Sequence, residues 1–297
     1  MKQAQKPKRS VGRRIALGVL LGLVVLLGIL LYRSKYCLTN AAYTIQSDRL
    51  EEPIRLVQLT DLHNSTFGRD NQRLIQLVEE QSPDLILITG DLVNSGVQNA
   101  EIATRLISNL CDIAPVYVSL GNHEIEYQKK YNVDLTAAYE KAGATVLEKS
   151  YEDITVNGQS LRIGGIYGYC LPEEFLKSGE ANPEECAFLS EFQDTKAYKL
   201  LLCHMPVCWI GGTSLGAWNV DCVLTGHLHG GQIILPGIGG LYAPDMGWFP
   251  GRLRGLYTSE DGRTTVVLSA GLGNTEWVPR FHNIPEIVTV DLQPERG

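Results

Sequence analysis

The chain has 297 residues, of which 44% are hydrophobic and 20% are charged, as in an ordinary globular protein. Eight of the 26 Lys and Arg lie before residue 36 and no acid precedes Asp48, which leaves 18 basic against 33 acidic residues, a formal charge of −15, for the rest of the chain. So acidic a domain argues against a nucleic-acid-binding surface, and bound cations could match part of its excess negative charge.

The first predicted element is a transmembrane helix over residues 15–32. All 18 residues of this stretch are apolar or small, and a helix of that length spans about 27 Å, close to the bilayer core of about 30 Å. Six of the eight early basic residues precede the helix. By the positive-inside rule, the basic segment 1–14 is then cytoplasmic and the domain that follows is extracytoplasmic, in a single-pass protein of the cell membrane.

Two other interpretations of this segment stay open. A cleaved signal peptide would have a shorter apolar region and a small-residue cleavage site, and neither is found here. Arg13-Arg14 raises a twin-arginine export signal, although the residues beside this pair match the motif weakly. We expect an uncleaved anchor, which makes the lipid bilayer a partner of the chain.

Behind the anchor, the sequence predicts one domain. Residues 33–52 are expected to form a linker with a first strand, residues 53–292 the domain itself, and residues 293–297 a tail. The seven Cys are odd in number and include no CxxC pair, so we expect mostly buried free thiols. A Cys170–Cys186 bridge stays open if the domain lies outside the cell.

Helices alternate with strands in the first half of the domain, and strands dominate the second half. Strands are predicted at 42–50, 54–60, 84–89, 116–120, 199–203, 221–224, 266–269 and 287–291, with a hairpin within 155–166. Helices are predicted at 71–81, 101–110 and 135–141. Gly and Pro are dense between 235 and 255, which indicates a long loop or lid. This order predicts an α/β fold, an α/β/β/α sandwich of two mixed sheets flanked by helices.

Five apolar strands are each followed by residue types that bind metals. These residues are Asp61-Leu62-His63, Gly90-Asp91, Gly121-Asn122-His123-Glu124, His204 and Gly226-His227-Leu228-His229. Five of the six histidines of the chain fall at these places. The sixth, His282, is expected to be structural. Because ligands of open α/β sheets collect beyond the carboxyl ends of strands, we expect these side chains to meet there.

The residue types and spacings indicate a metal site. Alternation in an extended segment would turn Asp61 and His63 to the same side, and likewise the two histidines after the fifth strand. A glycine before Asp91, Asn122 and His227 is expected to let the backbone turn sharply. Carboxylate, imidazole and amide oxygen together suit Mn²⁺, Fe, Zn²⁺ or Co²⁺. Two such divalent ions, ~3.5–4 Å apart, can clamp both oxygens of an in-line displacement.

The ordered pattern D-x-H, G-D, G-N-H-E, H, G-H-x-H resembles the calcineurin-like metallophosphoesterase superfamily. It is most similar to the bacterial membrane-associated branch, which has D-L-H-N after the first strand. The resemblance covers about residues 53–292. It implies a metal-dependent phosphoesterase, a phosphodiesterase or phosphatase, that hydrolyses phosphate-ester substrates by attack of a metal-activated hydroxide at a dinuclear centre.

The resemblance also implies roles for single residues. One metal would be held by Asp61, His63 and His229, the other by Asn122, His204 and His227, and Asp91 would bridge the two. His123 would not be a ligand but would face the scissile phosphate, stabilise charge and protonate the leaving oxygen. Asn64 would contact the phosphate.

One position departs from the family pattern. Asn94 stands where many relatives carry an acid that orients the histidine of G-N-H, and because an amide supplies no charge, we expect this histidine to be protonated less readily. In the Gly/Pro-rich loop, Arg252 and Arg254 are candidate substrate-binding residues for phosphate. Trp248 and Phe249 are candidates for contact with lipid or a hydrophobic substrate.

Two alternatives stay beside this interpretation. Similarity to relatives that cleave UDP-2,3-diacylglucosamine would make the protein a lipid-linked pyrophosphatase, an option that the membrane tether and Trp248-Phe249 keep open. A tether raises the effective concentration near the bilayer but does not identify a substrate. The other alternative is a non-catalytic scaffold on the same fold. Such proteins usually lose ligands, and this chain has lost none.

Overall fold

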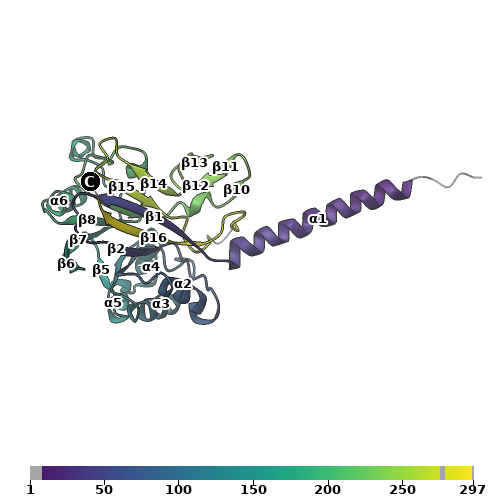
Figure 1. Cartoon of the computed structure of the whole chain (residues 1–297), viewed down its shortest axis with the longest axis horizontal. Helices are drawn as coiled ribbons and strands as arrows, with labels where there is room; N and C mark the ends of the chain where they lie inside the picture. The colour runs from purple at the N-terminus through teal and green to yellow at the C-terminus, as the bar shows by residue number, and fades with distance from the viewer. Residues whose placement is uncertain (1–8, 275–277, 296–297) are drawn as a thin grey trace, which may run out of the picture.

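The computed structural model describes residues 9–274 and 278–295 (Figure 1). Residues 1–8 of the predicted basic segment and residues 296–297 of the predicted tail lie outside the described residues. Helix α1 (Arg9–Tyr36) leads away from a body that holds all the other elements. It extends beyond the predicted span 15–32 at both ends. Its part from Val11 to Tyr36 is long and apolar enough to cross a membrane, and the apolar window of this part is not buried in the protein.

The first sheet has six strands in the order β1-β16-β2-β3-β4-β5. These are β1 (Thr39–Ser47), β16 (Glu286–Pro294), β2 (Ile54–Leu59), β3 (Leu85–Thr89), β4 (Val116–Ser119) and β5 (Thr145–Leu147). Strands β2 to β5 are parallel, whereas β16 is antiparallel to β2. Strand β1 pairs with β16 along its whole length. The segment predicted as linker and first strand therefore provides the edge strand of this sheet.

The second sheet also has six strands, in the order β14-β15-β9-β8-β7-β6. These are β14 (Gly255–Thr258), β15 (Thr265–Leu268), β9 (Cys222–Thr225), β8 (Tyr198–Cys203), β7 (Gln159–Ile166) and β6 (Ser150–Val156). The hairpin β6–β7 turns at Asn157-Gly158, as predicted, because both residues adopt the left-handed conformation that a tight hairpin turn needs. Strands β7, β8, β9 and β15 are parallel.

Helices cover the outer faces of the two sheets. The helices are α2 (Gln72–Glu79), α3 (Glu101–Cys111), α4 (Asn122–Tyr131), α5 (Leu135–Lys141), α6 (Pro183–Phe192) and α7 (Val207–Ile210), with 3-10 turns η1 (Arg69–Asn71), η2 (Glu173–Leu176) and η3 (His229–Gly231). One apolar core lies between the two sheets. A second core lies between the first sheet and its helices, and a third lies between the second sheet and its helices. The predicted α/β/β/α sandwich is confirmed.

The Gly/Pro-rich stretch is a long excursion between β9 and β14, built on two small hairpins. These pair β10 (Ile234–Leu235) with β11 (Gly239–Gly240) and β12 (Tyr242–Ala243) with β13 (Gly247–Trp248). All seven cysteines are free, as expected for most of them. Cys170 Sγ lies 3.6 Å from Cys203 Sγ, and Cys186 donates to a backbone carbonyl, so the Cys170–Cys186 bridge is not formed.

Candidate metal centre

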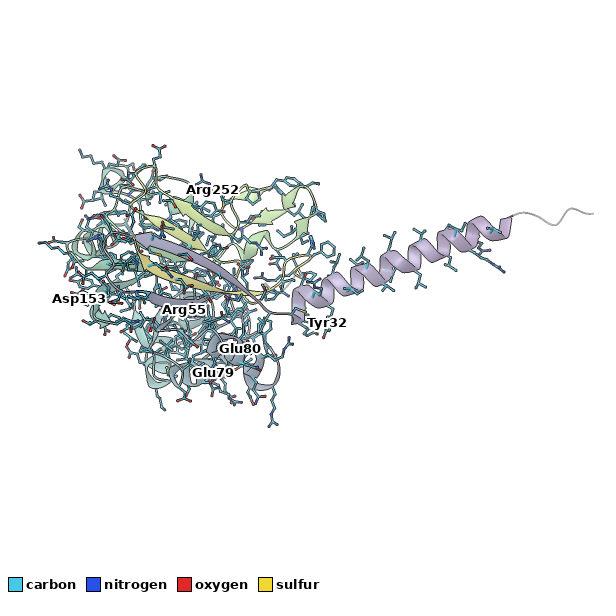
Figure 2. All side chains as sticks on the ribbon, in the orientation of Figure 1. Tyr32, Arg55, Glu79, Glu80, Asp153 and Arg252 are labelled. Atoms are coloured by element: carbon cyan, nitrogen blue, oxygen red, sulfur yellow. The ribbon has the colours of Figure 1, made fainter. Side chains whose placement is uncertain are left out.

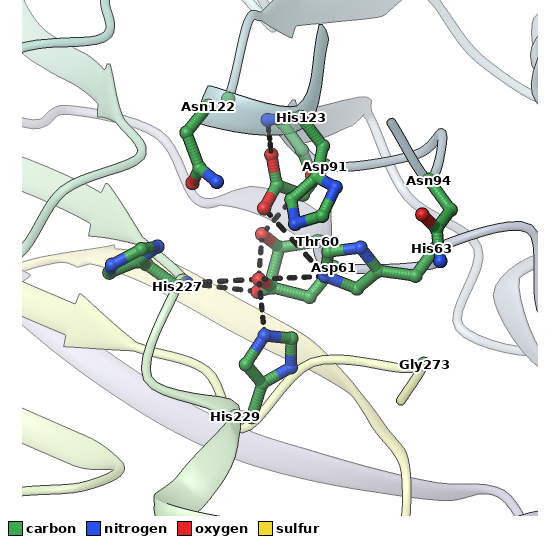
Figure 3. A network of polar contacts seen from close by, with 12 residues as sticks. Thr60, Asp61, His63, Asp91, Asn94, Asn122, His123, His227, His229 and Gly273 are labelled. Carbon is green, nitrogen blue, oxygen red and sulfur yellow. Dashed lines mark hydrogen bonds and ion pairs between the residues drawn. The ribbon is translucent and has the colours of Figure 1, made fainter. Parts of the chain in front are cut away.

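The structure brings the predicted metal-binding side chains together where β2, β3, β4, β8 and β9 end (Figure 3). Their potential ligand atoms form three groups, in each of which the atoms lie within 4.8 Å of one another. The groups are Asp61, His63 and His229; Asp91, His204 and His227; and His63, Asp91 and His123. The first two groups correspond to the two predicted metal positions.

Asp91 lies between these two positions. Its Oδ2 is 3.7 Å from His63 Nε2 on one side and 3.2 Å from His204 Nε2 on the other. Asp61 Oδ1 is 3.8 Å from His63 Nε2 and 3.7 Å from His229 Nε2. Figure 3 shows the two carboxylates facing the same space as the imidazoles. Side chains that are distant in sequence therefore form one buried cluster of acids and histidines that can hold metal ions.

Left-handed backbone, rather than strand alternation, turns these side chains into the cluster. Six site residues have positive φ angles between 46° and 69°, namely Asp61, His63, Asn64, Asp91, His227 and His229. Such angles are uncommon for residues other than glycine and concentrate at functional sites, where the surrounding fold compensates the strain. The expectation that each Asp-x-His or His-x-His segment is extended is thus wrong, although its side chains do converge.

The glycines beside the cluster serve two different purposes. Gly90 has φ 87° and makes the predicted sharp turn. Gly121 instead has an extended backbone, and a Cβ there would lie 2.1 Å from Asp91 Oδ1. A Cβ on Gly226 would lie 2.5 Å from Asp61 Oδ2. These two positions need glycine because a carboxylate approaches the backbone closely.

Glu124 fixes the two loops that carry Asp91 and Asn122. Its carboxylate is fully buried and accepts backbone N–H groups of Asp91 at 2.6 Å and of Gly121 at 2.9 Å. It also accepts the N–H groups of the two residues after Asp91 and the hydroxyl of Tyr139. Sequence reasoning assigned no role to this glutamate, although its place three residues after Gly121, at the N-terminus of α4, is that of a capping-box acid.

Two of the histidines are oriented by partners outside the cluster. His204 Nδ1 lies 2.7 Å from the carbonyl oxygen of Thr89, so it donates there and leaves Nε2 for the site, where Asn122 Oδ1 is 3.2 Å away. His227 Nε2 lies 3.0 Å from Asp245 Oδ2. Asp245 belongs to the Gly/Pro-rich excursion, and no sequence signal marked it. A carboxylate on the second ring nitrogen is a common partner of metal-binding histidines.

The electrostatics of the cluster favour a cation. Burial alone would raise the pKa of Asp61, but the imidazoles of His229 and His63 hold that pKa well below its usual range. Burial lowers the pKa of His229 to about 3, so this imidazole is neutral at pH 7. Burial opposes a charge on His204 as well, yet Asp91 raises the pKa of His204 to about 10. The ionised carboxylates thus favour positive charge between them, and bound divalent ions would supply that charge.

Several buried polar atoms of the site have no hydrogen-bond partner among the described residues. They are both ring nitrogens of His63, Nδ1 of His229 and both amide atoms of Asn64. Leaving such atoms unpaired in a protein interior is costly, and native structures usually pair them with protein, water or ions. The unpaired ring nitrogens together with the acid and imidazole donors therefore fit a metal centre, and the contact of Asn64 with phosphate stays a prediction.

His123 adjoins the cluster, with its ring edge-on to that of His63 at 4.5 Å between centroids. The backbone N–H of Ser95 donates to His123 Nδ1 at 3.1 Å, whereas the side chain of Asn94 accepts the N–H of Gly96. Asn94, which stands in the family's acid position, thus does not orient His123. The neighbouring Ser95 orients it through its backbone N–H. Burial lowers the pKa of His123, a cause other than the missing acid on which the expectation of less ready protonation rested.

The two arginines of the excursion are bonded within the protein. Arg254 Nη2 donates to Asn283 Oδ1 at 2.6 Å, and Asn283 donates in turn to the carbonyl oxygen of His229. Arg252 donates to the carbonyl oxygen of Ile210. Their predicted contact with substrate phosphate stays a prediction.

A third arginine, which sequence reasoning missed, lies fully buried near the centre. Arg280 donates to the carbonyl oxygens of Gly273 and Ala270, and burial lowers its pKa to about 10 while Asp61 opposes this change. An arginine in a loop with no apolar periodicity carries no sequence signal of such burial.

Comparison with known proteins agrees with this geometry. The chain is 27% identical to the uncharacterized metallophosphoesterase YkuE of Bacillus subtilis, over 88% of each chain. It is 30% identical to the uncharacterized metallophosphoesterase Cj0846 of Campylobacter jejuni, over 93% of this chain and 70% of that one. The phosphodiesterase YaeI of Escherichia coli is 28% identical over 65% of this chain and 66% of its own length.

A family model described as calcineurin-like phosphoesterase matches residues 54–231. This range begins with β2 and ends just after His229, so it contains each cluster residue named above. The chain therefore belongs to the calcineurin-like phosphoesterase family and is a metal-dependent hydrolase of phosphoric esters.

Proposed function

We propose that the protein is a membrane-tethered phosphodiesterase or phosphatase that works through two divalent metal ions. The observation that carries this proposal is the position of Asp91, whose carboxylate lies between a group formed with His63 and one formed with His204. The ligands proposed are Asp61, His63 and His229 for one ion, Asn122, His204 and His227 for the other, and Asp91 for both. Mn²⁺, Fe, Zn²⁺ and Co²⁺ suit this donor set.

The ions would polarise the phosphoryl oxygens and supply a water nucleophile activated at neutral pH. The residues of the chain position the substrate. Asn64 is proposed to donate to a phosphoryl oxygen, because its buried amide has no hydrogen-bond partner among the described residues. Because His123 Nδ1 accepts a hydrogen bond from Ser95, the neutral ring carries its proton on Nε2. His123 then donates a hydrogen bond to the phosphate or the leaving oxygen.

The tether is proposed from α1. Basic residues precede its apolar span, among them Arg13 and Arg14, and by the positive-inside rule they support a cytoplasmic start of the helix and a domain on the other side of the membrane. A scaffold without catalysis is disfavoured because each predicted ligand is present in the cluster. A lipid-linked pyrophosphatase would use the same metal cluster.

The test uses the full-length protein in detergent, its metal content measured by mass spectrometry, and bis(p-nitrophenyl) phosphate and p-nitrophenyl phosphate as substrates. We expect about two metal ions per chain, loss of turnover after chelation, and recovery with one of the four metals. Asp91→Asn should remove turnover and metal, whereas His123→Asn should lower kcat at least ~100-fold with metal retained.

The matched control is Glu79→Gln, which changes an exposed acid on α2 (Figure 2) and should behave as the wild type. Wild-type turnover in the metal-free protein, or in Asp91→Asn, would contradict the proposal. The ratio of diester to monoester turnover distinguishes phosphodiesterase from phosphatase.

A further inference from the structure

The C-terminal end of α1, which we call its root, is held directly against the domain and is not joined to it by a flexible linker. Only two residues separate the end of α1 at Tyr36 from the start of β1 at Thr39. The hydroxyl of Ser34, which is buried, accepts the backbone N–H of Asn283 at 3.2 Å, and the carbonyl oxygen of Tyr36 accepts Arg73 Nη1 at 3.0 Å. If α1 spans the bilayer, the end of the domain that holds these contacts lies at the membrane surface.

The metal cluster belongs to this same end of the domain. The side-chain amide of Asn283 donates to the carbonyl oxygen of His229 at 2.7 Å and to that of Gln232 at 3.3 Å. Asn283 thus contacts both Ser34 of the membrane helix and a proposed metal ligand. In Figure 1, the hairpins β10–β13 that follow η3 lie on the side of the body from which α1 leaves.

Beside the cluster, an open cavity of about 510 Å³ has an almost wholly apolar lining. His229 belongs to its wall, together with Leu228, Ile233, Leu241, Trp248 and Val278. Trp248 is 68% exposed and Val278 42% exposed, so apolar surface is presented outward at the rim. Exposed apolar surface of this kind marks an interaction site, and tryptophan favours the interface between membrane and water.

Charge at the root of the helix fits an anionic membrane. Although the domain as a whole is acidic, exposed cations lie at the end of α1, namely Arg33 and Lys35 in its last turn and Arg73, which donates to the carbonyl oxygen of Tyr36. Basic residues next to a transmembrane helix attract anionic lipid headgroups. Apolar surface, an aromatic rim and positive charge therefore occur together at the end of the domain that carries the metal cluster.

We propose that the cavity takes the hydrocarbon chain of a membrane lipid whose phosphate ester lies at the metal cluster. This inference rests on the proposed function and identifies its substrate class as amphiphilic lipid phosphates held in the bilayer. Burial of the chain in the cavity would replace its contacts with neighbouring lipids, while the headgroup enters the polar cluster next to His229. The apolar cavity and the cluster share that residue, so the proposed site of the chain adjoins the proposed site of the phosphate ester.

The first test compares two phosphodiesters that release the same p-nitrophenol but differ in chain length, hexadecyl p-nitrophenyl phosphate and methyl p-nitrophenyl phosphate. Full-length protein in nanodiscs of phosphatidylglycerol and phosphatidylcholine is assayed as wild type, Trp248→Ser and Leu241→Gln. We expect both variants to lower kcat/KM for the hexadecyl ester about tenfold and to leave the methyl ester within about twofold. Leu176→Ser, an exposed leucine of η2 that does not line the cavity, is the matched control.

The second test does not depend on turnover. A phosphatidylglycerol with a diazirine in its acyl chain is photolysed in the same nanodiscs with metal-free protein, and labelled peptides are mapped by mass spectrometry. We expect labels in α1 and also within residues 228–248. Labelling confined to α1, or equal effects of the variants on both esters, would overturn the inference.

The two proposals fail in different ways. If both esters are cleaved in a metal-dependent way and chain length has no effect, the proposed hydrolase function is supported and the lipid substrate is ruled out. No cleavage of either ester by metal-loaded protein removes the proposed function, and the lipid assignment with it, even where the acyl probe labels the cavity. If thymidine 5′-(p-nitrophenyl phosphate) is preferred and loses rate in Trp248→Ser, the cavity takes a nucleobase and the inference is wrong.

Discussion

Glu124 is the residue on which the shape of the site depends most. Its buried carboxylate accepts N–H groups from both loops that present Asp91 and Asn122. Glu124→Gln keeps the side chain's size but turns an amide N–H₂ toward backbone donors, which leaves buried groups unpaired. We expect the free energy of unfolding to fall by about 2–4 kcal/mol, measured by chemical denaturation, with weaker metal binding.

The control for this prediction lies on the same helix. Glu126 is exposed and bonds only the hydroxyl of Ser95 among its described partners. Glu126→Gln should stay within about 0.5 kcal/mol of the wild type. Equal stability of the two variants would show that the buried carboxylate does not organise the loops.

Asp245 gives a second prediction at this scale. The carboxylate of Asp245 lies 3.0 Å from His227 Nε2, so the Nδ1 atom of His227 is left for the cation. Asp245→Asn should weaken binding of Mn²⁺ or Zn²⁺ by about 10–100-fold, as for other outer partners of metal-binding histidines. Calorimetric titration measures this, with Asp261→Asn in the β14–β15 turn as control. Unchanged metal affinity would show that Asp245 does not contribute to metal binding through His227.

At the level of elements, Asp221 joins the two sheets. It accepts Arg49 Nη1, just after β1, at 2.7 Å, and the backbone N–H of Lys199 in β8 at 2.8 Å. The buried Lys199 Nζ is 3.6 Å away. Asp221→Ala leaves these groups without an anion, so we expect a loss of about 2–3 kcal/mol in the free energy of unfolding.

Two further variants test the cause of that loss. Lys199→Met combined with Asp221→Ala should recover part of it, since an unpaired buried ammonium is then removed. Arg55→Gln breaks an exposed ion pair between β2 and β16 (Figure 2) and should cost no more than about 0.5 kcal/mol. No recovery in the double variant would assign the loss to the hydrogen bonds alone.

For the whole molecule, the boundary of the folded domain can be tested by truncation. A chain that starts at Leu38 keeps β1 and its pairing with β16, whereas one that starts at Pro53 loses that strand and Arg49. We expect the first to be soluble and cooperative in thermal unfolding. The second exposes the edge of β16, so it should aggregate or unfold at least ~10 °C lower. Equal melting temperatures would make β1 dispensable.

Much of the fold was accessible from the sequence because buried parallel strands carry continuous apolar runs. β3 is such a run, and α3 shows the helical spacing of Ala103, Leu106, Ile107 and Leu110. Helix α4 was not predicted, since its buried residues are Glu124 and Tyr127 rather than an apolar stripe. Helix α6 was also missed, although Asn182-Pro183 is a recognisable N-terminal cap.

The sequence by itself determined which residues form the cluster, because metal binding needs particular side chains and these recur after successive apolar strands. Only the tertiary structure decided how they converge, since left-handed backbone at Asp61 and Asp91 depends on contacts from distant segments. It also decided the pairing of Asp245 with His227, the burial of Arg280, and the apolar cavity beside His229 near the end of α1. Such features arise from long-range packing, which local residue patterns do not encode.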